Sequence, residues 1–150
     1  MAEYSASAAQ TVNPGESVIF TDAPVPCVRG FVRHRDGSGN FLLSGAIQNG
    51  VRRCCCAKQS VDYLVGFGAN ISIPTGGTPG SISLAIAIDG STEPETTMTV
   101  TPAAVEEPFN VSRSTNVQIW TNCCETVVVR NISDQAIVVE NANITFVRQG

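Results

Sequence analysis

The sequence predicts an all-β protein, a sandwich or barrel of about eight to ten antiparallel strands in a single domain. Short runs of alternating apolar and polar residues recur about every ten residues, with glycine, proline, asparagine or aspartate between them. The chain has 13 glycines and 8 prolines, and only 15% of its residues are charged. No convincing amphipathic helix is present. A chain of 150 residues is long enough to bury one core.

The first part of the chain reads as a tail followed by short strands. Residues 1–9 are small and polar and are expected to form a flexible arm, so the domain is placed at residues 10–150. The prolines at 24 and 26 favour an extended connection over residues 22–26, because each disfavours a helical conformation in the residue before it. Strands are predicted before this connection at residues 17–20 and after it at residues 31–34. A third strand, at residues 40–45, follows the turn at residues 36–39.

Two longer strands are predicted in the middle of the chain, at residues 60–74 and 81–90. In the first, Gly66 and Gly68 lie opposite the apolar face, as in a bulge or where another backbone comes close. In the second, isoleucine and leucine alternate with small residues that are hardly polar, so both faces are expected to be covered, by another layer or another subunit. The residues assigned to such a subunit interface are Ser83, Ala85 and Ala87.

The remaining sequence continues the same pattern. Residues 102–108 are expected to form a loop or a single helical turn, because prolines stand at both ends. The strands predicted here cover residues 96–101, 109–112, 117–120, 126–131, 136–140 and 144–148.

Charge and hydropathy limit the partners. The net charge is −4 and no basic run extends beyond Arg52 and Arg53, so a nucleic-acid partner is not expected. No window of about 20 apolar residues occurs, so no membrane span is expected. Residues 1–9 lack the basic start and apolar run of a secretion signal, so the product is expected to be made in the cytoplasm and, if exported, released by lysis. A low content of charged residues favours a surface that is buried in an oligomer.

Six cysteines are the most distinctive residues: Cys27, Cys54, Cys55, Cys56, Cys123 and Cys124. They permit disulfides between the 54–56 and 123–124 loops, within or between subunits, although cytoplasmic thiols are normally reduced. A zinc site is an alternative, but contiguous cysteines diverge in an extended chain. Free thiols are the third interpretation, and the sequence does not decide among the three.

Catalysis finds little support in the sequence. His34, the only histidine, lies between two arginines, as at a solvated strand end, and no nucleophile or phosphate-binding motif is present. Glu106 and Glu107 are adjacent, and adjacent side chains usually diverge. Asp89, Glu93 and Glu95 offer oxygens to calcium but lack the spacing of a calcium-binding loop. No catalytic residue, cofactor or metal site is therefore assigned, and calcium and zinc remain alternatives.

The order of these strands resembles the ten-stranded jelly roll of the C1q/tumour-necrosis-factor-like superfamily. The resemblance covers roughly residues 10–148, through the turn and strand at 17–20, the strands at 40–45, 63–73 and 81–90, and the closing strands at 125–131 and 143–148. It extends to the heads of bacterial collagen-like proteins and to small phage and Firmicutes surface proteins. The resemblance implies a compact trimer with the C-terminal strand near the three-fold axis. A Gly-X-Y stalk is absent, and the cysteine clusters depart from the family pattern.

Two functions are consistent with these features. The first is a structural protein: a self-assembling jelly roll that associates with its own copies as a homotrimer. It decorates or stabilises a larger particle. That particle is a phage virion, with capsid proteins as further partners, or a spore or cell-surface layer. The second is a receptor-binding or carbohydrate-binding head that uses loops at one end of the sandwich. Loops 75–80 and 91–95 carry no aromatic residue that would favour it.

Overall fold

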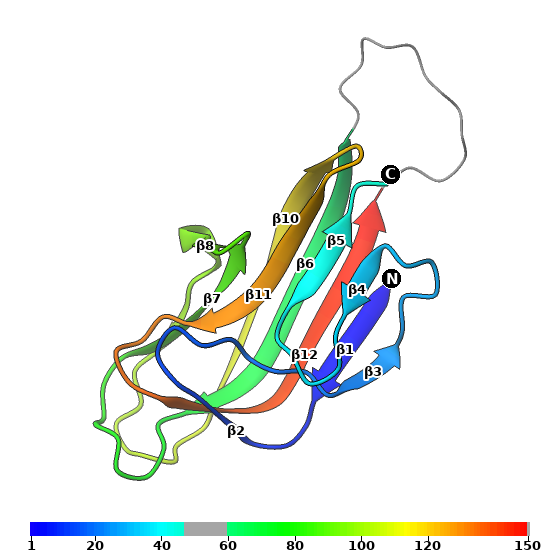
Figure 1. Ribbon diagram of the computed structural model, residues 1–150. Helices are drawn as coiled ribbons and strands as arrows, with labels where there is room; N and C mark the ends of the chain where they lie inside the picture. The colour runs from blue at the N-terminus through cyan, green and yellow to red at the C-terminus, as the bar shows by residue number, and fades with distance from the viewer. Residues whose placement is uncertain (47–59, 150) are drawn as a thin grey trace.

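Two antiparallel β-sheets pack face to face in the computed structural model, which describes residues 1–46 and 60–149 (Figure 1). The sheet that contains the first and last strands is called the terminal sheet here. Its strands, in spatial order, are β10 (Phe109–Trp120), β6 (Ser60–Ser72), β12 (Ile137–Gln149), β1 (Ala2–Ala6) and β3 (Asp22–Val25), with β2 (Gln10–Val12) also on β12. The second sheet holds β4 (Val32–His34), β5 (Phe41–Ser44), β11 (Cys124–Asn131), β7 (Ile82–Ile88) and β8 (Ser91–Thr92), with β9 (Met98–Val100) also on β7.

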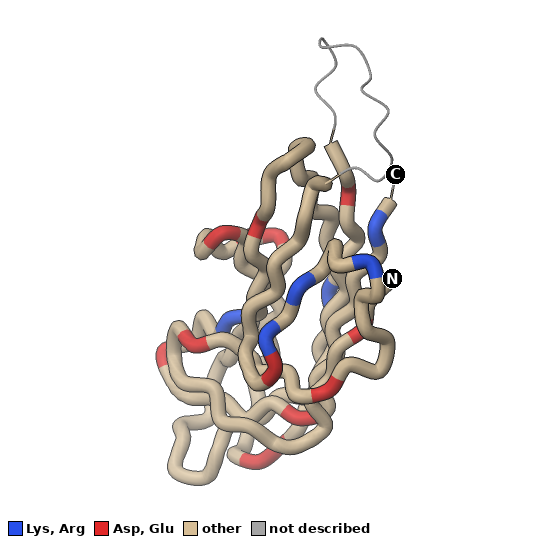
Figure 2. The backbone as a smooth tube through the Cα atoms, turned by 45° about the vertical axis from the view of Figure 1, so that its right-hand side comes forward, with Lys and Arg blue, Asp and Glu red and all other residues tan. Residues whose placement is uncertain are grey.

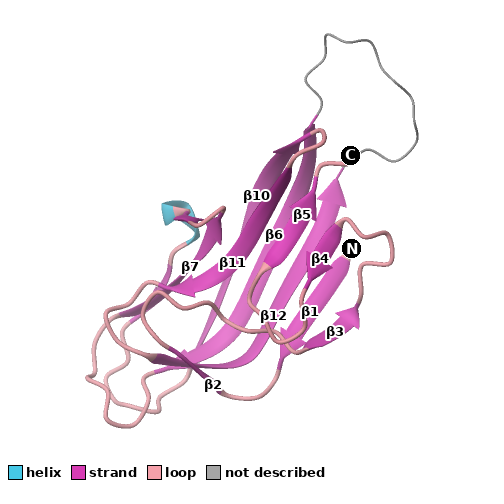
Figure 3. Cartoon of the chain, in the orientation of Figure 1, coloured by secondary structure: helices cyan, strands magenta, loops and turns pink. Residues whose placement is uncertain are grey.

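The prediction of an all-β sandwich in one domain is confirmed. Apart from the single 3₁₀ turn η1 (Pro94–Thr96), the described residues form strands and loops (Figure 3). Within the described ranges, no helix is long and apolar enough to cross a bilayer.

The core lies between the sheets, where every second side chain of the long strands points inward. On β6 the inward set is fully alternating, from Val61 through Phe67 to Ile71, and each is at most 3% exposed. Four aromatic rings fill the centre: Tyr4 and Phe146 from the terminal sheet meet Phe41, and Phe20 meets Phe41 at 5.3 Å between ring centroids. Burial of each such ring contributes roughly 2–3 kcal/mol, so this cluster joins the two layers.

One polar side chain in the core closes the end of the sandwich. Asn131 is fully buried, and its Nδ2 donates to the carbonyls of Val12 and Gln135, both at 2.9 Å. Its Oδ1 accepts from the Ser133 N–H at 2.8 Å. Because a buried amide without partners would be costly, these bonds fix the end of β11 against β2 and the turn before β12.

The prediction that residues 1–9 form an arm is wrong. Residues 2–6 are β1, which pairs with β12 from Ala2 opposite Phe146 to Ala6 opposite Ala142, and with β3 on its other side. Ala2, Tyr4 and Ala6 are each at most 6% exposed. The sequence pattern did not predict this strand, because its small residues, alanine and serine, alternate with little contrast in hydropathy.

The assignment of Ala85 and Ala87 to a subunit interface is not supported, because a single chain already covers both alanines, whereas for Ser83, which is half-buried, it stays a prediction. Ala85 and Ala87 have no exposed surface. Arg130 lies directly opposite Ala85 on β11, and its Nη1 donates to the Gly90 carbonyl at 3.2 Å, beyond the end of β7. The Ser83 hydroxyl lies 2.7 Å from Thr99 Oγ1. The small residues leave room for neighbouring side chains of the same chain.

In two places, a single long strand replaces two strands that the sequence predicted separately. The runs at residues 109–112 and 117–120 are the two ends of β10, which pairs with β6 without interruption. The runs at 136–140 and 144–148 belong to β12, whose register with β6 shifts between Glu140 and Asn143. Residues 17–20 form only isolated bridges, Ser17 with Arg130 and Phe20 with Ser38.

Candidate functional site

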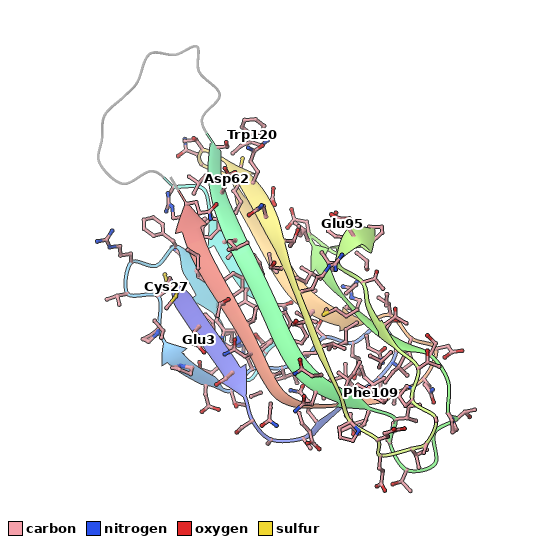
Figure 4. All side chains as sticks on the ribbon, turned by 180° about the vertical axis from the view of Figure 1, so that it is seen from behind. Glu3, Cys27, Asp62, Glu95, Phe109 and Trp120 are labelled. Carbon is pink, nitrogen blue, oxygen red and sulfur yellow. The ribbon has the colours of Figure 1, made fainter. Side chains whose placement is uncertain are left out.

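The outer side of the terminal sheet is the broadest surface that the fold leaves without a covering layer (Figure 4). Its centre consists of β10, β6 and β12, whose outward side chains alternate with the core residues. We call it the polar face, and it comprises Asp62, Leu64, Gly66, Gly68, Asn70, Asn110, Ser112, Ser114, Asn116, Gln118, Asn143, Thr145 and Val147. Asp62 is the charged residue of this set, and Glu140 of β12 and Glu3 of β1 lie on the same side of the sheet, opposite Asn70 and Thr145. Elsewhere the charges are spread singly or in small groups along the chain (Figure 2).

A hollow of about 700 Å³ lies in the polar face. Its floor is the backbone of β6 at Gly66 and Gly68. Ser112 and Ser114 of β10 line one side, and Asn143 and Thr145 of β12 line the other. Arg113 and Glu95 also line the hollow at the β10 side, so the lining offers hydroxyl, amide and charged groups around exposed peptide backbone, which suits a polar partner.

The two glycines of the floor differ in what the fold requires of them. A Cβ at Gly66 would lie 2.9 Å from Thr145 Oγ1, so the neighbouring strand needs this glycine. A Cβ at Gly68 would meet nothing nearer than 3.8 Å. Since internal packing does not exclude a side chain at Gly68, the missing side chain there leaves the floor open to another molecule.

The polar face is ordered by hydrogen bonds between neighbouring strands. Asn110 Nδ2 donates to Asn70 Oδ1 at 3.1 Å across β10 and β6. Asn143 Nδ2 donates to Glu3 Oε1 at 2.5 Å across β12 and β1. These side chains are held in place before any partner arrives, which lowers the entropy cost of binding.

At the outer edge of β10 the hollow ends at a charged pair of residues. The Arg113 Nε and Nη2 both donate to the Glu95 carbonyl, at 3.0 and 2.8 Å. Glu95 belongs to η1, so Arg113 ties β10 to the turn that precedes β9. The guanidinium is thereby held at the β10 side of the hollow, which Arg113 and Glu95 both line.

Three of the cysteines predicted to cross-link lie in the described residues, and each of them is a free thiol. Cys27 is half-buried, and the Val32 N–H donates to its Sγ at 3.4 Å. Cys123 and Cys124 are exposed free thiols at the turn between β10 and β11. Cys54, Cys55 and Cys56 lie outside the described residues. No disulfide is formed within the described part of the chain, so a cross-link between copies remains a prediction.

The acidic residues considered for calcium lie in different settings. Asp89 Oδ1 accepts from the Thr126 N–H at 2.7 Å, which holds the turn after β7 on β11. Partial burial raises the pKa of Glu125, and the charges of Asp89 and Glu93 raise it further. Glu95 lies by Arg113 instead. Residues 1–46 and 60–149 contain no group of three or more histidine, cysteine or carboxylate ligands arranged to hold a metal ion.

His34 and Glu106 have structural contacts. The His34 ring stacks on Phe41 with 4.5 Å between centroids, and its Nε2 donates to the Ser38 carbonyl at 3.0 Å. Glu106 accepts a hydrogen bond from the Thr75 hydroxyl at 2.6 Å, in a cleft of about 440 Å³ at the end of β6. The ring packing of His34 and the hydrogen bond of Glu106 to Thr75 account for both residues.

No protein family and no curated protein matches the sequence. A solved structure, the globular domain of zebrafish complement 1qA protein, superposes with a TM-score of 0.55 over 96% of this chain and 94% of that one, at 8% identity. The fold is a C1q/TNF-like jelly roll. The resemblance inferred from the strand order is thus confirmed at the level of fold.

Two further solved structures overlap this jelly roll less closely. The C-terminal domain of EclA, a sugar-binding protein, gives a TM-score of 0.39 at 9% identity, over 93% of this chain and 79% of that one. The CBM22-1 xylan-binding domain of Xyn10C from Paenibacillus barcinonensis gives 0.37 at 11% identity, over 99% and 94%. TM-scores below 0.5 support no inference about the ligands of this protein.

The hollow itself was only partly foreseeable from the sequence. Two glycines on the non-core side of a long strand predicted a place of close backbone approach, and the hollow lies there. The walls were not foreseeable, because Ser112 and Thr145 come near Gly66 and Gly68 only through strand pairing.

Proposed function

We propose that this protein is a non-enzymatic structural protein that associates with its own copies through the polar face. The assembly is a homotrimer that decorates or stabilises a larger particle, either a phage virion or a spore or cell-surface layer. The single observation that carries the proposal is the polar face: it is broad, rich in hydroxyl and amide groups and uncovered, with an open glycine floor at its centre.

The position of the C-terminal strand supports three-fold association. β12 runs through the middle of the terminal sheet, between β6 and β1, so its outward residues lie near the centre of that surface. The C1q/TNF-like resemblance implies a trimer with this strand near the axis. A closed ring buries one such surface in every copy, which stops further growth.

In a three-fold ring the polar face of one copy meets a different surface of the next, and the same residues of the three copies converge only at the axis. Small hydroxyl residues let two backbones approach closely, and amides can donate and accept at once. The charged side chains on and beside the face, Asp62, Glu3 and Glu140, are all carboxylates, so the contact between copies must keep them apart. Polar interfaces of this kind depend on good fit, which the open floor at Gly68 provides.

Replacing Gly68 with glutamate tests the proposal. The fold has room for the side chain, so we expect the Gly68→Glu chain to remain folded. The carboxylate would fill the hollow and be buried without a partner in the assembly, which costs several kcal/mol. Light scattering after size exclusion should therefore give a multiple of three chain masses for the natural protein and no such multiple for Gly68→Glu.

Asn40→Glu is the matched control, because Asn40 is exposed just before β5 in the other sheet. It adds the same charge and should leave the trimer intact. A Gly68→Glu protein that stays trimeric, with an unchanged circular dichroism spectrum, would rule out the polar face as the contact surface.

A second candidate function is a receptor-binding or carbohydrate-binding head, and the lining of the hollow is the observation in its favour. Ser112, Ser114, Asn143 and Thr145 offer the hydroxyl and amide groups that bind sugar hydroxyls. A glycan array separates the two functions: a monomer that binds a glycan, and loses it in Gly68→Glu, supports the head.

A further inference from the structure

The edges of the two sheets differ in how well they are protected from pairing with another strand. In the terminal sheet, β3 is four residues long and contains Pro24, which has no N–H to donate. In the second sheet, β4 has three residues with Arg33 at its centre, and β8 and β9 have two and three residues. Short strands, prolines and charges are the usual means of keeping an edge unpaired.

The edge formed by β10 is neither short nor interrupted by proline, although it has one arginine and lies near η1 and β9. It runs for 12 residues without proline, glycine or a register shift in its pairing with β6. Its one charged residue, Arg113, is bonded to the Glu95 carbonyl. Within the described residues, the backbone groups of Phe109–Ile119 have no recorded backbone partner except β6. A long, regular edge of this kind is a template for one more strand.

The sequence of β10 indicates which strand fits. Read outward from Ser114 in both directions, chemically similar residues occur at equal distances. Val111 matches Val117, Asn110 matches Gln118, Phe109 matches Ile119 and Ser112 matches Asn116, whereas Arg113 lies opposite the unlike Thr115. An antiparallel copy of β10 centred on Ser114 would therefore place apolar residues opposite apolar ones and amides opposite amides.

This register also keeps the two arginines apart. With Ser114 opposite itself, each Arg113 faces Thr115 of the second copy, not the other arginine. The inward residues remain inward, because residues directly opposite in an antiparallel pair share a face. The strand is thus complementary to itself in polarity, in size and in charge.

We propose that β10 pairs with β10 of a second copy about a two-fold axis at Ser114, so that the two terminal sheets form one continuous sheet. This contact goes beyond the proposed trimer, because it uses the outer backbone edge of β10, although Ser112 and Ser114 of the same strand also line the hollow. Where both contacts form, a two-fold contact links trimers to one another, and such a second contact is what a coat or layer needs.

Cysteine cross-linking tests the register directly. In a chain whose exposed Cys123 and Cys124 are replaced by serine, Ser114→Cys should form a disulfide to its own copy under mild oxidation. Directly opposite Cα atoms lie about 4.5–5.5 Å apart, within the range that a disulfide spans. We expect most of the Ser114→Cys chain to run as a covalent dimer, with the peptide containing residue 114 linked to itself by mass spectrometry.

Ser112→Cys is the matched control, because Ser112 is exposed on the same face of the same strand. In the proposed register its two copies lie four residues apart along the strands, about 13 Å, which a disulfide cannot bridge. We expect at least a ten-fold lower yield of dimer from Ser112→Cys. Equal yields from both variants, or no dimer from Ser114→Cys, would overturn the proposal.

Combining the cross-link with Gly68→Glu separates the two contacts. If the edge pairs independently, Ser114→Cys in the Gly68→Glu chain still forms the covalent dimer while the trimer is lost. Loss of the cross-link in this double variant, with the chain still folded, would show that the edges meet only inside the trimer and would contradict an independent two-fold contact.

Discussion

At the scale of single residues, the clearest electrostatic feature is Glu125 beside Asp89 and Glu93. Partial burial raises its pKa, and the two neighbouring carboxylates raise it further. The folded chain therefore holds the Glu125 proton more tightly than the unfolded chain does. The stability this contributes is present below the ordinary glutamate pKa of about 4.3, and it is lost as the pH rises through the raised value.

Glu125→Gln should remove this pH dependence. We expect the variant to melt at a higher temperature than the natural protein at pH 7, where the ionised Glu125 is repelled by Asp89 and Glu93. The difference should disappear below about pH 4, where the natural side chain is protonated. Thermal unfolding at pH 3, 5 and 7 measures it, with Glu107→Gln as the exposed control. A gain of equal size at pH 3 would contradict this cause.

At the scale of elements, β1 shows where sequence patterns fail. Strand β6 was predictable because bulky apolar residues alternate with polar or small ones over its whole length. β1 was not, because Ala2 and Ala6 have too little side chain to mark an inward face, although both are buried. The small residues Ala85 and Ala87 of β7 were interpreted as an interface. Arg130 of the same chain lies opposite Ala85, but this neighbour becomes known only once the strand pairing is known.

The role of β1 can be measured through Tyr4. Its ring is 6% exposed and lies 4.9 Å from the centroids of both Phe41 and His34. Tyr4→Ala should lower the free energy of unfolding by about 3–5 kcal/mol, as for other large-to-small changes of aromatic residues in cores. Ser5→Ala, on the outward side of the same strand, should change it by less than about 0.5 kcal/mol. Urea unfolding that gives equal midpoints for both variants would indicate a dispensable arm.

At the scale of the whole molecule, the strand order was enough to predict the jelly roll, while its surfaces were not predictable. Hydrophobic alternation reports what faces the core, so it identifies strands and the sandwich. A hollow such as the one at Gly68 depends on which strands become neighbours, and the pairing of β6 with both β10 and β12 brings together residues about 45 to 80 positions apart in sequence. The same holds for the long β10 edge, because only the sheet order shows that β10 is outermost.

The number of copies in solution tests the central claim most directly. Native mass spectrometry or light scattering of the natural protein, with reductant present, should give three times the chain mass of 15.8 kDa, or six times where β10 edges also pair. Reductant excludes cross-linking by the exposed thiols as the cause of association. A monomer that persists at the highest soluble concentration would contradict the proposal that the polar face joins copies of this chain.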